Sequence, residues 1–237
     1  TRAREADPEH YEAAYNIAVV LEEMGRTDEA VKAYLESAKL APGDPEPYMD
    51  VAEIEFAAGD LAGAGNALAE AFERAPHQLE LGLKALELLV DAGKDEKALT
   101  LARKLAKRLG PKAAKNLEAS LRVVRSLRLL GDPAAALQLL QKIPGSKNLP
   151  FSLLTETGLC YLAMGQCKKA SKAFDDALDV KPDSLAAKLA KADALCCAHK
   201  WCKAKRAYKK FLKAAPADHP AVTAVKAKLA QGKKSCK

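Results

Sequence analysis

The sequence contains few aromatic residues and no long apolar run. Phe, Trp and Tyr make up 5% of its 237 residues, and they do not alternate with the basic residues. Base stacking on aromatic side chains, which is common in single-stranded nucleic-acid binders, therefore has little support. No run of about 18 or more uncharged apolar residues occurs, so we expect no membrane-spanning helix.

Cysteine is absent from the first 159 residues, and the chain begins with neither Met nor an apolar secretory segment. The six cysteines all follow, at positions 160, 167, 196, 197, 202 and 236. A small secreted fold built on disulfides would not place them so unevenly. We therefore expect an intracellular protein, cytoplasmic or nuclear, in a reducing compartment. We interpret the chain as part of a longer one.

Motifs that carry catalytic chemistry are also missing. The sequence has no G-x-x-x-x-G-K-[ST], H-E-x-x-H or G-x-S-x-G. Its four histidines, at positions 10, 77, 199 and 219, are far apart in the sequence and do not form a cluster. A general base needs a partner and a pocket. We expect no enzymatic activity and no cofactor.

A repeat of about 34 residues runs along the chain. Prolines recur at this interval at 8, 42 and 76, then at 111, and again at 182 and 216. Glycines at 25, 59, 93, 131 and 165 each follow a stretch of helical length and periodicity. Alanines at 30, 64, 98, 136 and 170 come about five residues later. Each glycine permits a turn between two helices, and each alanine permits their close crossing.

The segment 151–183 carries the pattern most fully. Its residues Gly158, Tyr161, Gly165, Ala170, Phe174, Ala177 and Pro182 resemble the tetratricopeptide repeat. The resemblance implies an all-α, right-handed superhelical solenoid of about six helix-turn-helix repeats in one domain, 1–237. We place the end of a preceding repeat at 1–8, which predicts further repeats N-terminal to it. The repeats follow at 11–44, 45–78, 79–111, 112–148, 151–184 and 185–218, and a closing helix with a basic tail at 219–237.

Two units depart from the pattern. Leu86 and Val124 stand where the repeat usually has a small residue, so we expect altered helix packing in the middle of the chain. Helix starts are marked more regularly. Asp60, Asp132 and Asp183 each stand where a side chain caps the first turn of a helix.

The stretch "LCCAHKWC" at 195–202 concentrates potential metal ligands. His199 takes the place that glycine has in other units, so it belongs in the turn of the last repeat. Stacking of adjacent repeats would bring together thiols of two units, which suits zinc or a disulfide. The candidate cluster is Cys160, Cys167, Cys196, Cys197, His199 and Cys202. The spacing matches no known ligand framework, so we favour packed thiols around a histidine turn.

Charge divides the chain in two. Residues 1–110 carry 13 Lys and Arg against 22 Asp and Glu, a net charge of −9. Residues 111–237 carry 25 against 9, a net charge of +16. Two basic stripes stand out at helical spacing. We call Arg122, Arg125 and Arg128 the arginine stripe, and Lys203, Arg206, Lys210 and Lys213 the lysine stripe.

The resemblance implies where these stripes lie. In tetratricopeptide proteins the first helix of each pair lines a concave groove that receives peptides, and the second lines the convex back. The arginine stripe would then face the groove, together with Tyr15, Asn16, Asp50 and Glu53. The lysine stripe would face outward. Of the family's carboxylate clamp only Asn16 matches, so we do not expect chaperone tails as ligands.

The leading hypothesis is a non-catalytic scaffold that binds segments of partner proteins within a larger assembly. The arginine stripe would receive acidic or phosphorylated segments, or would instead pair with carboxylates of adjacent repeats as a structural element. The alternative function is a nucleic-acid-associated module whose basic C-terminal half contacts phosphates. Two further readings stay open: docking of the acidic half of one molecule on the basic half of another, and a solvated lysine stripe that serves solubility.

Overall fold

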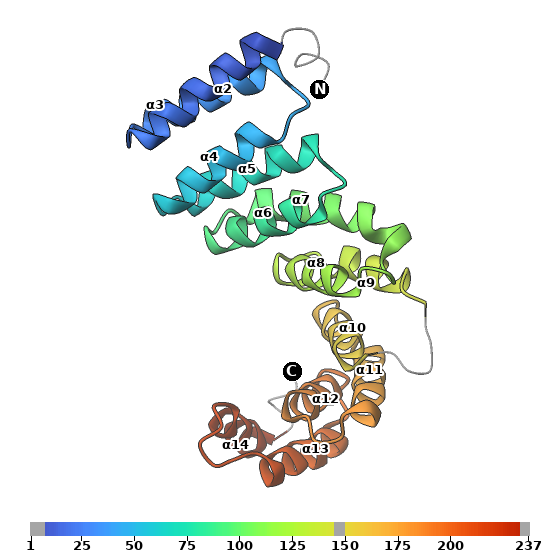
Figure 1. The fold of residues 1–237 in the computed structure, drawn as a ribbon. Helices are drawn as coiled ribbons and strands as arrows, with labels where there is room; N and C mark the ends of the chain where they lie inside the picture. The colour runs from blue at the N-terminus through green and yellow to red at the C-terminus, as the bar shows by residue number, and fades with distance from the viewer. Residues whose placement is uncertain (1–7, 145–149, 233–237) are drawn as a thin grey trace. The chain divides into compact units, whose positions relative to one another are not determined.

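The computed structural model describes residues 8–144 and 150–232, and all regular structure in them is helical (Figure 1). The chain divides into two compact units, Thr1–Leu105 and Ala106–Lys237. Unit 1 contains three helix pairs: α2 (Pro8–Glu23) with α3 (Thr27–Leu40), α4 (Glu46–Ala57) with α5 (Leu61–Arg74), and α6 (Leu79–Asp91) with α7 (Asp95–Leu109), which crosses the boundary. The boundaries of the individual repeats stay predictions.

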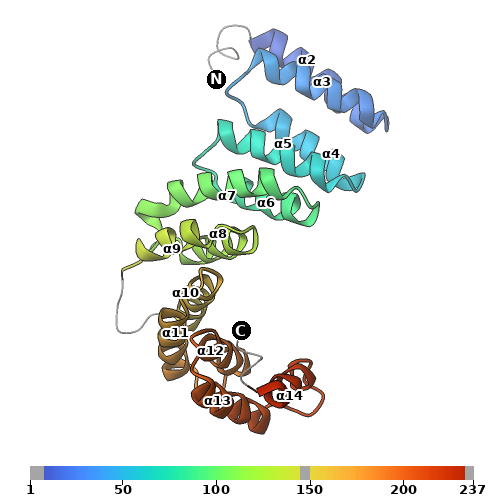
Figure 2. The same ribbon diagram turned by 180° about the vertical axis from the view of Figure 1, so that it is seen from behind.

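Unit 2 continues the same pattern (Figure 2). After the short 3-10 helix η1 (Gly110–Lys112) its pairs are α8 (Leu117–Leu129) with α9 (Pro133–Gln141), α10 (Phe151–Ala163) with α11 (Cys167–Val180), and α12 (Leu185–Cys197) with α13 (Trp201–Ala214). A single helix, α14 (Ala221–Gln231), follows. The expected all-α class and paired helices are confirmed. The single continuous domain stays a prediction, as does everything placed in 1–7, 145–149 and 233–237, which lie outside the described residues.

The turns inside the pairs follow the sequence pattern. Gly165 has φ +69°, a left-handed conformation that glycine adopts without steric cost. His199 has φ +56° at the matching place between α12 and α13. The prediction that this histidine replaces a turn glycine is therefore confirmed. Helix starts agree in part: Asp60 and Asp132 accept bonds from Gly63 N and Ala135 N at 2.9 and 3.0 Å. For α12 the cap is Ser184 and not Asp183.

Small residues sit where helices cross. The five periodic alanines, at 30, 64, 98, 136 and 170, are completely buried. A Cβ atom on Gly158 of α10 would lie 2.6 Å from Cε1 of Phe174 on α11. In the third pair the close approach has moved: Leu86 is buried, and Gly82 lies against Phe72 and Leu105, 3.0 and 2.8 Å from an added Cβ. The small residue of this unit is thus one helical turn earlier than the pattern expects.

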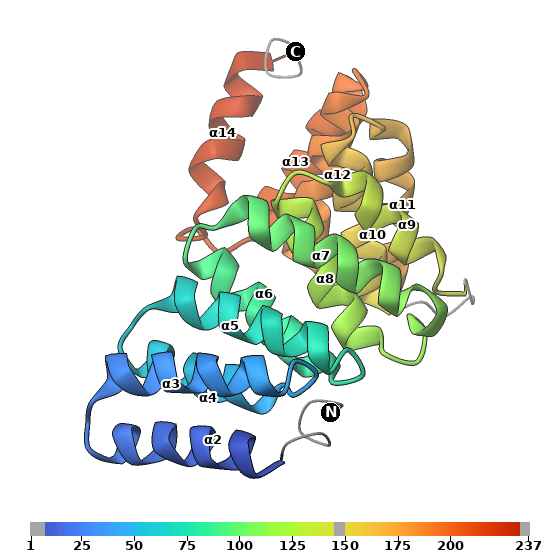
Figure 3. The ribbon, with the colours of Figure 1, turned by 90° about the horizontal axis from the view of Figure 1, so that it is seen from above.

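The helix α14 closes the apolar core at the end of unit 2. Val222 and Val225 are buried in one apolar cluster with Tyr208 and Phe211 of α13. Figure 3 shows the ribbon of α14 as a separate helix after α13. Asp193 of α12 accepts hydrogen bonds from Tyr208 Oη and from Lys228 Nζ of α14, both 2.6 Å long. In the part of the chain that the structure describes, no helix has both the length and the apolar character that crossing a membrane requires.

Candidate protein-interaction surfaces

The arginine stripe lies on α8, and its counter-charge comes from α10. Arg125 Nε donates to Glu156 Oε1 at 3.2 Å, and Arg128 Nε donates to Glu156 Oε2 at 3.0 Å. The Glu156 side chain is only 6% exposed, whereas that of Arg125 is 64% exposed. A buried carboxylate needs such partners, because an unpaired buried charge is strongly destabilising. The structure therefore brings two of the three predicted arginines together on one carboxylate of the next repeat.

Glu156 also shapes the chemistry of a neighbouring thiol. Cys160 follows it by one helical turn and is completely buried. Burial raises the pKa of the Cys160 thiol to about 12; the charge of Glu156 adds to this and that of Arg128 opposes it. At neutral pH Cys160 is thus a protonated core residue and not a nucleophile.

In unit 1 the predicted groove residues divide into two kinds. Tyr15 of α2 donates its hydroxyl hydrogen to Asp50 of α4, which joins the first helices of two successive pairs. Burial and the hydrogen bond to Asp50 raise the pKa of Tyr15, and burial raises the pKa of Asp50 despite this bond. Asn16 and Glu53 remain exposed. Tyr15 and Asp50 therefore have a structural contact with each other, whereas Asn16 and Glu53 are accessible to a partner.

An apolar stripe on α2 was not predicted. Ile17 and Val20 of α2, and Met24 directly after its last residue, are between 52% and 62% exposed. Their spacing of three and four residues puts them on one helix face, a pattern that the sequence already carries. On α4, Phe56 is half-exposed, with Lys84 Nζ of α6 at 5.6 Å from its ring centre.

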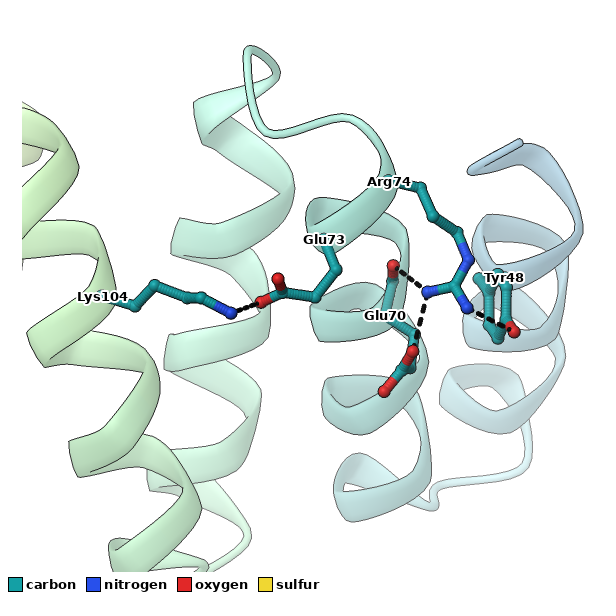
Figure 4. Close-up of polar contacts among 5 residues, drawn as sticks. All are labelled: Tyr48, Glu70, Glu73, Arg74 and Lys104. Carbon is teal, nitrogen blue, oxygen red and sulfur yellow. Dashed lines mark hydrogen bonds and ion pairs between the residues drawn. The ribbon is translucent and has the colours of Figure 1, made fainter. Parts of the chain in front are cut away.

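Two cations on the second helices of unit 1, Arg74 and Lys104, have partners in the structure (Figure 4). Arg74 of α5 donates to the main-chain and side-chain oxygens of Glu70, both at 2.7 Å, and to Tyr48 Oη at 2.8 Å. Lys104 of α7 forms an ion pair with Glu73 of α5. These contacts tie one helix to the next, so the cations here have structural partners.

The cysteine cluster contains a disulfide. Cys167, the first residue of α11, is bonded to Cys197, the last residue of α12, with their Cα atoms 5.6 Å apart. The expectation of packed thiols is wrong for this pair, because the stacking of α11 on α12 brings the two cysteine side chains together. Cys160 is a buried free thiol and Cys202 an exposed one. Among the described residues, no three His, Cys, Asp or Glu side chains are grouped closely enough to hold a metal ion.

Three of the four residues of the lysine stripe line a cavity, and the fourth does not. Lys203, Arg206 and Lys210 of α13 line a cavity of about 600 Å³ that α11 and α12 also border. Lys213 is exposed on the same helix but is not among the lining residues. Lys188 and Lys191 of α12, which lie outside the predicted lysine stripe, also line the cavity. Their spacing of three residues was the available signal.

Helix pairs of this length, with small residues at the crossings and a turn residue in left-handed conformation, define a tetratricopeptide-repeat solenoid. The sequence agrees: the family model described as "Protein kinase G tetratricopeptide repeat" matches residues 83–231, and a second model, "Tetratricopeptide repeat", matches residues 1–45. The chain belongs to the Protein kinase G tetratricopeptide repeat family. No curated protein shows significant sequence similarity to it.

Solved structures show the same fold. A tetratricopeptide repeat protein from Parabacteroides merdae has a TM-score of 0.56 and 18% identity, covering 95% of this chain and 88% of its own. The MamA protein has a TM-score of 0.56 and 22% identity, covering 72% of this chain and 91% of its own. The C-terminal part of a repeat protein from Cytophaga hutchinsonii has a TM-score of 0.52 and 18% identity, covering 84% and 78%. At these identities the likeness is one of fold.

Proposed function

We propose that this chain is a non-catalytic scaffold that binds segments of partner proteins, and that the arginine stripe on α8 receives an acidic or phosphorylated segment. The observation that supports this most is the arrangement of Arg125 and Arg128 around Glu156. One carboxylate is paired with two guanidinium groups. Arg125 and Arg128 together therefore keep a positive excess over Glu156 that an anionic partner would neutralise.

The bonds to Glu156 also orient the guanidinium groups. Each arginine uses its Nε to reach Glu156, and a guanidinium has four further N–H donors in a planar fork. Such a fork binds carboxylates and phosphates through two parallel hydrogen bonds, which lysine cannot do. Because the side chains are already held, less conformational entropy is lost when a partner binds. Arg125, which is largely exposed, is the group best placed for that contact.

Substitution separates this site from a purely structural one. The variant Arg122→Gln/Arg125→Gln/Arg128→Gln should lose binding of a fluorescein-labelled peptide that carries phosphoserine among glutamates, measured by fluorescence anisotropy. Because the triple substitution leaves the buried Glu156 without Arg125 and Arg128, the melting temperature should also fall, so binding is compared for the folded fraction of each variant. The matched control is Lys205→Gln/Lys209→Gln/Lys213→Gln on α13, where all three lysines are exposed. It removes the same charge and should retain peptide binding.

A different result would contradict the proposal. If the arginine variant loses much stability while its folded fraction still binds the peptide, Arg125 and Arg128 serve only to hold α8 and α10 together. Equal loss of binding in both variants would mean that net charge, and not the stripe, attracts the peptide.

A further inference from the structure

A basic groove lies in unit 2, and none of its lining residues belongs to α8, the helix of the arginine stripe. Three helices border it: α11, α12 and α13. Six cationic side chains line it, namely Lys188, Lys191, Lys200, Lys203, Arg206 and Lys210. Its apolar lining includes Leu178, Leu195 and Ala207. The volume of about 600 Å³ is within the range of ligand sites in proteins.

Most of this positive charge is uncompensated. Asp175 is the only acidic residue of the lining, and it forms an ion pair with Lys191. Lys188, Lys200, Lys203 and Lys210 form no ion pair with any residue that the structure describes. Lys104 of α7, by contrast, has a counter-ion, Glu73 of α5. Like charges that converge on a concave surface repel each other, so binding of an anion there would be favourable.

The spacing of the cations suits an extended chain. Lys203, Arg206 and Lys210 repeat at three and four residues and so lie on one face of α13. From Lys200 to Lys210 the axial rise is about 15 Å, at about 1.5 Å per residue. An extended polypeptide covers that distance with about five residues. Lys188 and Lys191 add a second cationic row from α12.

The apolar lining decides which kind of anion fits. None of the lining residues is aromatic, so the groove has no platform on which a base could stack. A ligand that contacted the groove only through phosphates would leave Leu178, Leu195 and Ala207 without an apolar contact. A peptide that alternates acidic and apolar side chains would use both the cationic rim and the apolar floor.

We propose that this groove is a second binding site, and that its occupant is an extended acidic segment of a partner protein that places an apolar side chain on Leu178, Leu195 and Ala207. It is separate from the arginine stripe in position, and its occupancy does not depend on that stripe. A scaffold with two such sites would hold two acidic segments, or two parts of one partner, at once.

The probe for this site is a fluorescein-labelled peptide with glutamates on both sides of a central leucine. Its affinity, measured by fluorescence anisotropy at moderate salt, should fall by about tenfold or more in Lys203→Gln/Arg206→Gln/Lys210→Gln, because three charged contacts are lost. Replacing the central leucine of the peptide with serine should also weaken binding several-fold. The same control as before, Lys205→Gln/Lys209→Gln/Lys213→Gln, removes equal charge from other positions of α13 and should bind almost as well as the unaltered chain.

Several outcomes would overturn the proposal. If peptide affinity falls equally in the two triple variants, or does not change when serine replaces the central leucine, then general positive charge attracts the peptide and the groove is not a specific site. Tighter binding of an oligothymidine than of the peptide, lost in the groove variant, would make the occupant nucleic acid. Sedimentation that reveals a salt-sensitive dimer, abolished by the groove variant, would make it a second copy of this chain. Arginine-stripe substitutions should leave unchanged the loss of affinity that follows replacement of the central leucine, so the two sites fail or succeed separately.

Discussion

Glu156 shows how one buried residue serves two helices. It belongs to α10 but its carboxylate is held by Arg125 and Arg128 of α8. Removing one partner of a buried pair leaves an uncompensated charge, which costs more than the pair itself contributes. The structural and the binding roles of the arginine stripe are therefore compatible: Arg128, which is 18% exposed, anchors Glu156, and Arg125 reaches the surface.

Gly158 is the residue whose substitution should most clearly disturb unit 2. An alanine there would place its Cβ 2.6 Å from the ring of the buried Phe174. Alanine favours helix over glycine by about 1 kcal/mol, but overpacking a core costs about 1–3 kcal/mol. We expect Gly158→Ala to lower the free energy of unfolding, measured by urea titration. Gly110→Ala is the control, since no atom lies within 4 Å of its added Cβ. Unchanged stability of Gly158→Ala would mean that α10 and α11 are not closely packed.

The helices α11 and α12 are connected by more than packing. The disulfide between Cys167 and Cys197 joins the start of one helix to the end of the next, across 30 residues. A cross-link of this kind reduces the conformational freedom of the unfolded chain. Because the same two helices border the basic groove, the bond also restrains the walls of that groove.

Loss of this disulfide should destabilise the protein. For a closed loop of about 30 residues the chain-entropy estimate is about 3–4 kcal/mol, an upper value where the reduced chain keeps structure. We expect Cys167→Ser to lower the melting temperature and to reduce its dependence on reductant. Cys202→Ser, which removes an exposed free thiol, should change neither. Peptide mapping without reductant that finds both Cys167 and Cys197 as free thiols would contradict this prediction.

Across the whole molecule, stability should be local to each unit. In repeat proteins each helix pair contacts only its neighbours, so a perturbation weakens along the stack. Net charge changes sign near the boundary between the units, with an excess of acidic residues in 1–110 and of basic residues in 111–237. Regions of a protein can therefore open with different free energies.

Hydrogen exchange followed by mass spectrometry tests this locality. Gly158→Ala should accelerate amide exchange in α10, α11 and α12 and leave α2 to α4 unchanged. The reciprocal variant, Gly65→Ala, adds a Cβ 2.9 Å from Leu89 Cγ in unit 1. It should accelerate exchange in α4, α5 and α6 and leave α12 and α13 unchanged. Uniform acceleration over the whole chain in either variant would show that the protein unfolds as one cooperative block.

The amino-acid sequence by itself determined the helix pairs, their length, the turns at Gly165 and His199 and the small residues at the crossings. These features depend on backbone conformation and short-range periodicity, which a few neighbouring residues decide. It also identified the arginine and lysine stripes, because the helical spacing of charged residues can be read directly from the sequence. Only the tertiary structure decided that Glu156 holds two arginines, that Cys167 meets Cys197 and that Lys188 and Lys191 share a groove with α13. These contacts join residues 12 to 31 positions apart on separate helices, and their distances depend on how the helices pack.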